Sequence, residues 1–130
     1  MVKRKKLPSI KALRNKLDKI FNAYIRTRDG ACILSGETTG LVCSHYYGKR
    51  AAPFLRWDER NAHAMSKKMH WLHHHGREAD YALWMFEHNS KIYMRKLALD
   101  SKKQAKYTRD IYLQLVEKYQ KKLKKIENRL

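Results

Sequence analysis

The chain has 130 residues, with 30 lysines and arginines against 12 aspartates and glutamates, and its formal net charge at pH 7 is +18. This length fits one compact domain with a modest hydrophobic core and helical extensions. A protein this basic repels itself unless an anion balances its charge, so the expected partner is a polyanion. Eight tyrosines and three tryptophans in a sequence that is 43% hydrophobic exclude a disordered basic tail.

Neither secretion nor membrane insertion is expected from this sequence. It contains no run of 18 apolar residues, and no apolar segment follows the basic residues 1–6. The two cysteines, Cys32 and Cys43, are too few for a disulfide framework or a complete zinc site. We therefore expect a cytoplasmic protein that does not act at a membrane.

The first predicted element is an amphipathic helix over residues 9–28. Ser9 follows Pro8 and is a typical N-cap, and apolar residues then recur at three- and four-residue spacing. Gly30 predicts the end of this helix, because glycine adopts the left-handed conformation at little cost.

A β-hairpin is predicted next, with strands in the apolar runs 31–34 and 41–46 on either side of the turn-rich segment 35–40. Residues 48–60 lack any period and predict a basic loop, and residues 61–66 a short connector. Loops of this kind often carry function. Four basic side chains in it are candidate nucleic-acid contacts: Lys49, Arg50, Arg56 and Arg60.

The rest of the chain is predicted to be helical. Residues 67–76 and 78–88 each favour a helix, and Thr108 is a typical N-cap for a long amphipathic helix with a lysine-rich outer face. Lys121 and Lys122 on that face are candidate phosphate contacts. The patterns together predict an α+β, mainly helical protein with a single domain over 1–130. Its parts are an N-terminal helix at 9–28, a core at 31–76 and a helical C-terminal extension at 78–130.

Six of the seven histidines lie between positions 45 and 75. His70 and His74 are four residues apart, which on a helix places both imidazoles on one face, close enough to share a metal ion. Such a spacing also arises by chance in a histidine-rich segment. It gains weight from the order in the chain, because His45 follows a predicted strand and Asn61 ends the basic loop before His70.

This order of His, Asn and His resembles the HNH (ββα-metal) nucleases, in which a hairpin, a loop and a helix supply the three residues in turn. His74 also fits the last position of the colicin-type branch. A closer resemblance, over most of the chain, is to the NinG (Rap) recombination endonucleases of lambda-like phages. It rests on Tyr24–Asp29, on Ser44-His45, on the segment Leu55–His63 and on the lysine-rich C-terminal helix.

The resemblance implies a ββα-metal (HNH) core flanked by an N-terminal helix and long C-terminal helices. It also implies a phage protein that acts on DNA, duplex or branched, in the cytoplasm of a bacterial host cell. A single-metal site cuts one strand at a time, so a homodimer is a candidate assembly for cutting both strands.

The sequence departs from the family at the structural zinc site. NinG proteins carry two cysteine pairs that hold zinc, whereas these positions read here Cys32 with Ser35 and Ser66 with Met69. One thiol does not hold tetrahedral zinc, so no structural zinc is expected. Met69 is expected to join the hydrophobic core instead.

The resemblance assigns a role to each residue of the ordered set. His45 would take a proton from water as the general base, and Asn61 would brace the loop that follows it. His70, counted with the catalytic residues, and His74 would bind one divalent ion together with waters. Mg or Mn is expected, with Zn or Ni as alternatives. Ser44 occupies a position that is often an acidic or histidine ligand, and it is included as a weak one.

Several assignments stay open at this point. His73 or His75 is a further candidate ligand, and Arg56, in preference to Arg60, would clamp a phosphate through its planar guanidinium. His63 matches the NinG pattern and is interpreted as structural. The alternative function is a non-catalytic basic nucleic-acid-binding protein on a degenerate HNH scaffold, and an RNA-binding or ribosome-associated protein is a third. Loss of activity in His45→Ala would separate the nuclease from both.

Overall fold

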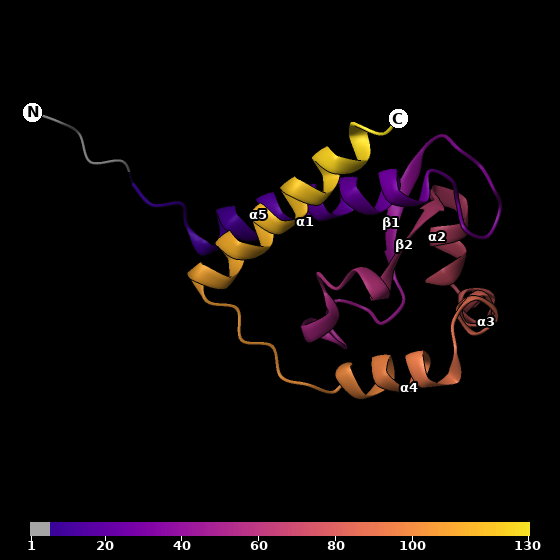
Figure 1. The fold of residues 1–130 in the computed structure, drawn as a ribbon. Coiled ribbons are helices and arrows are strands. Elements are labelled where there is room, and N and C mark those ends of the chain that lie inside the picture. Colours follow the sequence, from indigo (N-terminus) through magenta and orange to yellow (C-terminus); the bar gives the residue numbers. More distant parts are fainter. Residues whose placement is uncertain (1–5) are drawn as a thin grey trace, which may run out of the picture.

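The computed structural model describes residues 6–130 and shows an α+β, mainly helical fold, as the sequence predicted (Figure 1). In this range there are five α-helices and one two-stranded antiparallel sheet. The first five residues of the predicted 1–130 domain lie outside the described residues. The elements in chain order are α1 (Ile10–Asp29), β1 (Leu41–His45), two short 3₁₀ turns (Pro53–Leu55 and Glu59–Asn61), β2 (Ala62–Ser66), α2 (Lys67–His73), α3 (Glu78–His88), α4 (Lys91–Asp100) and α5 (Arg109–Glu127).

The first and last helices lie side by side and run in the same direction (Figure 1). The hydroxyl of Ser9 caps α1 and Gly30 ends it at a φ of 68°, while Thr108 caps α5, all as predicted. The guanidinium of Arg109 donates to the carbonyl of Pro8, which joins the two helix starts. Their apolar faces enclose one core, formed by Leu13, Leu17, Phe21, Tyr24, Ile25, Trp57, Ala62, Tyr112, Val116 and Tyr119.

The sheet pairs β1 with β2, and the predicted strand at residues 31–34 was wrong. Leu41 lies opposite Ser66 and His45 opposite Ala62, so the predicted connector at 61–66 supplies the second strand. Residues 32–36 form a tight turn instead, in which the amide of Ser35 donates to Sγ of Cys32 at 3.3 Å. The turn is also fixed to β2, because the amide of Ile33 donates to the carbonyl of Ala64 at 3.0 Å, and β1 pairs with this more distant segment.

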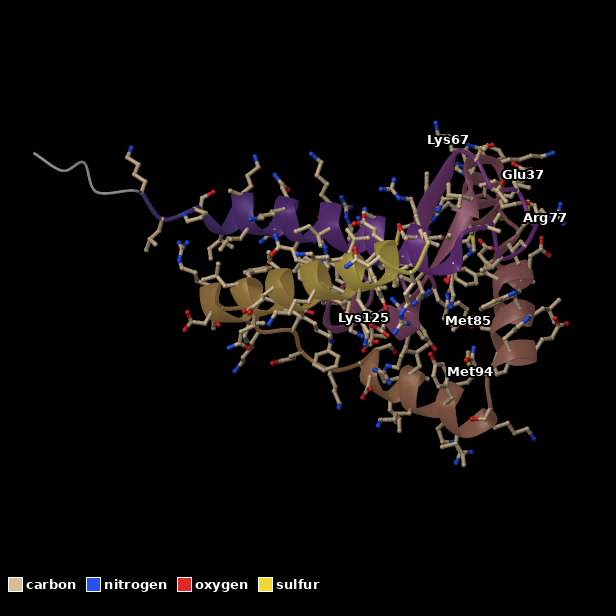
Figure 2. All side chains as sticks on the ribbon, turned by 45° about the horizontal axis from the view of Figure 1, so that its top comes forward. Glu37, Lys67, Arg77, Met85, Met94 and Lys125 are labelled. Carbon is tan, nitrogen blue, oxygen red and sulfur yellow. The ribbon has the colours of Figure 1, made fainter. Side chains whose placement is uncertain are left out.

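The three middle helices close the other side of the molecule (Figure 1). Helices α2 and α3 lie where they were predicted, whereas α4 was not predicted. Figure 2 shows Met85 of α3 and Met94 of α4 on the sides of these helices that face the middle of the molecule, where both are buried. Met69 packs against the same core, as expected, and this second core consists of Cys32, Ala52, Leu55, Met65, Tyr81, Met85, Met94 and Leu97.

None of the helices within residues 6–130 combines the length and the apolar character needed to cross a bilayer.

Candidate functional site

The last residue of β1, His45, is held in one defined orientation. Its side chain is 7% exposed, and Nε2 lies 2.8 Å from the carbonyl oxygen of Arg56. A carbonyl only accepts hydrogen bonds, so Nε2 carries the proton and Nδ1 keeps a free lone pair. Burial lowers the pKa of His45 to about 4 and outweighs the opposing effect of the Arg56 carbonyl. The imidazole is therefore neutral at pH 7 and has one nitrogen able to accept a proton.

Asn61 fastens the loop that connects the two strands. It is fully buried, and its Oδ1 accepts the amide proton of Tyr47 at 2.8 Å. Its Nδ2 donates to the carbonyls of Tyr47 at 2.9 Å and Leu55 at 3.3 Å. The loop is thus held just after His45 and just before Arg56, whose carbonyl orients His45. The bracing contacts that the resemblance implied for Asn61 are present.

A hollow of about 460 Å³ brings three of the predicted histidines together. It is lined by His45, by His70 of α2 and by His74, the C-cap residue of α2, together with Lys49 and Arg50 of the loop. The ring centroids of His70 and His74 are 4.6 Å apart and the rings are nearly perpendicular. The hollow therefore combines a neutral histidine, a histidine pair and two cations, although these residues come from separate parts of the sequence.

The histidine pair is the part of the hollow that fits a metal ion. Nδ1 of His70 is buried and has no hydrogen-bond partner among the described residues, which is costly unless another ligand satisfies it. Burial, with smaller effects of His74 and His73, lowers the pKa of His70 and favours the neutral form that binds metals. Within residues 6–130, however, no group of three or more His, Cys, Asp or Glu side chains is placed to hold an ion. Any ion here would depend on two imidazoles and water.

Ser44 does not belong to this hollow, and its assignment as a metal ligand was wrong. Side chains alternate between the faces of a strand, and Cys43 and His45 on either side of Ser44 both line the hollow. Ser44 lies opposite His63 in the register, so its side chain faces the other way. Its hydroxyl is buried and finds no hydrogen-bond partner within the described part of the chain.

The two arginines expected to clamp phosphate are instead engaged by carboxylates. Arg56 donates to both oxygens of Asp18 in α1, at 3.3 and 2.7 Å. Arg60 contacts Asp58 at 2.9 and 2.7 Å and Asp100 of α4 at 2.9 Å. The two side chains therefore tie the basic loop to α1 and α4. A phosphate contact by either guanidinium would have to compete with its carboxylate partners, and the assignment of both residues as nucleic-acid contacts stays a prediction.

The predicted phosphate contacts on α5 are also paired. Lys121 lies 2.9 Å from Glu117 on the same helix, and Lys122 lies 2.7 Å from Glu59 in the loop. Neither side chain lines the histidine hollow. Of the six basic residues predicted to contact nucleic acid, only Lys49 and Arg50 lie at the hollow.

Two further histidines of the cluster face elsewhere. His75 stacks on Trp71, with ring centroids 4.0 Å apart, and is exposed. His73 lines a neighbouring hollow together with His74. His73 thus stays close to the site, whereas His75 does not.

Tyr81 is a residue of the site that sequence reasoning missed. Its hydroxyl donates to the carbonyl of Ser44 at 3.2 Å, and Nδ1 of His63 lies 2.8 Å from the hydroxyl oxygen of Tyr81. Because the hydroxyl has only one hydrogen, which it donates to Ser44, its oxygen accepts a hydrogen bond from the Nδ1–H of His63. These bonds tie α3 and β2 to the residue before His45 and agree with the structural interpretation of His63. Tyr81 fits the apolar pattern of a helix, so no motif could have identified it.

The fold and the site define a small basic protein in which an antiparallel strand pair and the following helix enclose a histidine-lined hollow. The family model described as Bacteriophage Lambda NinG protein matches residues 1–129. The chain therefore belongs to the NinG family, as the sequence resemblance indicated. No curated protein and no solved structure matches the chain.

Proposed function

We propose that this chain is a metal-dependent DNA endonuclease of the HNH type, which hydrolyses phosphodiester bonds. The observation that carries the proposal is the joint lining of one hollow by His45, His70 and His74, with Lys49 and Arg50 at its side. Membership in the NinG family supports the proposal, because the resemblance of the sequence to the NinG recombination endonucleases implies this activity.

The chemistry proposed for His45 follows from its tautomer. Nε2 donates to the carbonyl of Arg56, so the lone pair of Nδ1 would accept the proton of the attacking water. Asn61 would act as a positioning residue, because its bonds to Tyr47 and Leu55 fix the loop that carries that carbonyl. A hydrogen-bonded imidazole of fixed orientation suits proton transfer to a single defined water.

His70 and His74 would hold the divalent ion, Mg or Mn with Zn or Ni as alternatives. The chemistry that the ion supplies when bound is neutralisation of the phosphate and stabilisation of the leaving oxygen. Lys49 and Arg50 take over the phosphate contact first expected of Arg56. Both are exposed, and neither forms an ion pair with any described residue. Arg50 offers the bidentate geometry that suits a phosphate.

The substrate would be duplex or branched DNA, such as a recombination or replication intermediate, in the cytoplasm of the bacterial host cell. A homodimer would allow both strands to be cut. One observation favours the second candidate function, a non-catalytic nucleic-acid-binding protein. The described residues offer two imidazoles and no acidic ligand for the ion, fewer than a protein-dominated metal site usually has.

The deciding experiment compares wild type with His45→Ala on supercoiled plasmid and on a synthetic four-way junction, with Mg, Mn, Zn or EDTA. Loss of a general base is expected to lower metal-dependent nicking by about 10²- to 10⁴-fold. His88→Ala is the matched control, because His88 is exposed and stacks on Trp84 outside the hollow. Nicking that survives in His45→Ala would contradict the mechanism, and DNA binding without cleavage in any metal would favour the second candidate.

A further inference from the structure

The histidine hollow continues into a groove that runs from the end of β1 to α3 and α4. A second hollow of about 410 Å³ shares His45, Gly48 and His74 with the first. A third, of about 420 Å³, shares Tyr46 and Tyr47 with the second and reaches both helices. Because neighbouring hollows share lining residues, the three lie next to one another, and they follow in order from His70 past His45 and Tyr46 to α4.

The far part of this groove is aromatic. Tyr46 packs edge-on against the buried Tyr81, with ring centroids 5.2 Å apart, and against Tyr47 at 4.9 Å. The backbone of Tyr47 is fixed by Asn61. Phe86 on α3 lines the same hollow and is 59% exposed. Two tyrosines of fixed position and an exposed phenyl ring therefore offer flat apolar surface to whatever enters the groove.

The groove is also basic. Lys91 and Arg95 lie one turn apart on α4 and line the third hollow, as Lys49 and Arg50 line the first. Lys91 and Arg95 are exposed, and no described carboxylate forms an ion pair with either. Glu78 is the one acidic residue among the described side chains that line the groove. The four cations line the two outer hollows and Glu78 lines the middle one, so the two ends of the groove favour a negatively charged occupant.

We propose that the part of the groove formed by Tyr46, Tyr47 and Phe86 binds unpaired nucleotides of a DNA strand. Aromatic side chains flanked by lysine and arginine are the surface that single strands require, because their bases are free to stack while their phosphates meet the cations. In an intact duplex the bases are stacked on each other and do not reach the aromatic rings. The groove therefore selects DNA that carries an unpaired segment.

This inference rests on the proposed function for its placement of the cut, since the groove leads directly to His45. An unpaired segment held beside Phe86 would place a phosphodiester bond of the same strand, or of the adjoining duplex, in the histidine hollow. The preferred substrate would be a duplex with a single-stranded arm, with the cut close to the point where the arm begins.

The test measures binding in EDTA, where no cleavage occurs, by fluorescence anisotropy with the full chain. The probes are a labelled 15-nucleotide oligo-dT and a blunt 15-base-pair duplex. Phe86→Ala is expected to weaken binding of oligo-dT at least about fivefold and binding of the duplex less than twofold. Leu83→Ala is the matched control, because Leu83 is 60% exposed on the same helix and lies outside the groove. Both substitutions are at exposed positions, and unchanged thermal unfolding would verify that the variants fold.

The cations are tested by the dependence of oligo-dT affinity on salt. Replacing Lys91 and Arg95 together by alanine is expected to reduce the slope of log K against log salt by about 1.4, since each single-strand phosphate contact contributes about 0.7. A double replacement of Lys96 and Lys102, which are exposed but lie outside the groove, is expected to leave the slope unchanged.

Equal losses on oligo-dT and duplex would overturn the proposal, as would no loss on either probe. A lower oligomeric mass of Phe86→Ala in sedimentation would overturn it too, because the exposed ring would then belong to a contact between copies of the chain. These outcomes do not depend on cleavage. A wild type that binds oligo-dT through Phe86 but cuts no plasmid would retain the groove and reject the nuclease.

Discussion

Burial divides the histidines into groups that the sequence does not distinguish. His45 is buried and His63 is half-buried, and burial lowers the pKa of each to about 4. His75 and His88 lie at the surface, each stacked on the tryptophan one turn before it. The dense run of histidines is therefore not one metal cluster, and only its members on the inner face of α2 reach the hollow.

His63 provides a prediction about pH and stability. Its pKa is lowered from 6.5 to about 4, mainly by burial and also by Arg28, so between these values the unfolded chain binds a proton that the folded chain does not. The stabilisation from keeping His63 neutral is complete above pH 6.5 and is lost as the pH falls toward 4. Its full size is on the order of 3 kcal/mol. Urea unfolding at pH 7.5, 6 and 5 should thus show a weaker pH dependence for His63→Gln than for wild type.

His75→Gln is the control for this measurement, because the ring of His75 is exposed and does not contribute to the lowered pKa of His63, whereas His88 does. Parallel pH dependences of wild type and His63→Gln would show that His63 is not the group responsible.

At the scale of elements, the turn at residues 32–36 and the start of α2 lie together. They carry the four positions at which the resemblance implies zinc-binding cysteines. Burial raises the pKa of the Cys32 thiol, but hydrogen bonds from the Ser35 hydroxyl and from the amides of Ser66, Ser35 and Leu34 outweigh burial and hold the pKa below its usual value. The hydroxyl of Ser66 accepts the amide proton of Met69 at 3.2 Å and caps α2. Hydrogen bonds and the packing of Met69 hold these two segments together here, in place of the zinc-bound thiolates that the resemblance implies for the family.

This arrangement predicts that the zinc site can be rebuilt. The triple replacement Ser35→Cys, Ser66→Cys and Met69→Cys adds three thiols beside Cys32, and should raise Tm by about 10 °C at a zinc concentration 100 times the Kd. In EDTA the same variant should be less stable than wild type by about 1 kcal/mol, because it loses the hydroxyl cap of α2. In a His70→Ala background, which removes the proposed ion site at His70 and His74, the chain without the three new cysteines should have the same Tm with zinc and with EDTA.

Calorimetry of the triple variant with Cys32→Ser added provides the control, since three thiols give a weaker and incomplete site. A zinc-dependent rise in Tm that persists in His70→Ala without the new cysteines would mean that Cys32 and its neighbours already bind the metal.

At the scale of elements, the sequence predicted correctly those helices and strands whose determining contacts are local. The caps Ser9 and Thr108 act within one turn of their own helices, and both helices begin where predicted. The second strand, Ala62–Ser66, has no β-branched residue and is fixed by pairing with a segment 20 residues away, so its own pattern did not reveal it. The order of His45, Asn61 and His70 located the hollow because that motif encodes a three-dimensional arrangement.

The ion pairs of Arg56 and Arg60 could not be predicted for the same reason. Asp18 lies 38 residues from Arg56 and Asp100 lies 40 residues from Arg60, and nothing in the local sequence indicates that they meet; only Asp58, the other partner of Arg60, is local. Several of the few Asp and Glu residues engage particular lysines or arginines. We expect the remaining, unpaired cations to be the ones most available for phosphate.

For the whole molecule, the net charge of +18 therefore does not give the number of cations that can meet DNA, because that number depends on which of the 30 lysines and arginines form ion pairs. Nitrogen-tipped side chains extend from the outer sides of α1 and α4 and from α5, where Lys125 is labelled (Figure 2). Long-range attraction from this charge would speed encounter with any nucleic acid, whereas the groove and the hollow would determine where it is bound.

The last turn of α5 allows the distribution of these contacts to be measured. Lys124 and Lys125 are exposed, and no described carboxylate pairs with them, whereas Lys121 and Lys122 are bound to Glu117 and Glu59. Replacing Lys124 and Lys125 by alanine should reduce the salt slope of duplex binding by about 1.8, because each duplex phosphate contact contributes about 0.9. Replacing Lys121 and Lys122 removes the same formal charge but should change the slope much less. Binding in EDTA between 50 and 300 mM salt checks both variants, and equal changes in slope would mean that formal charge, irrespective of ion pairing, governs how this protein holds DNA.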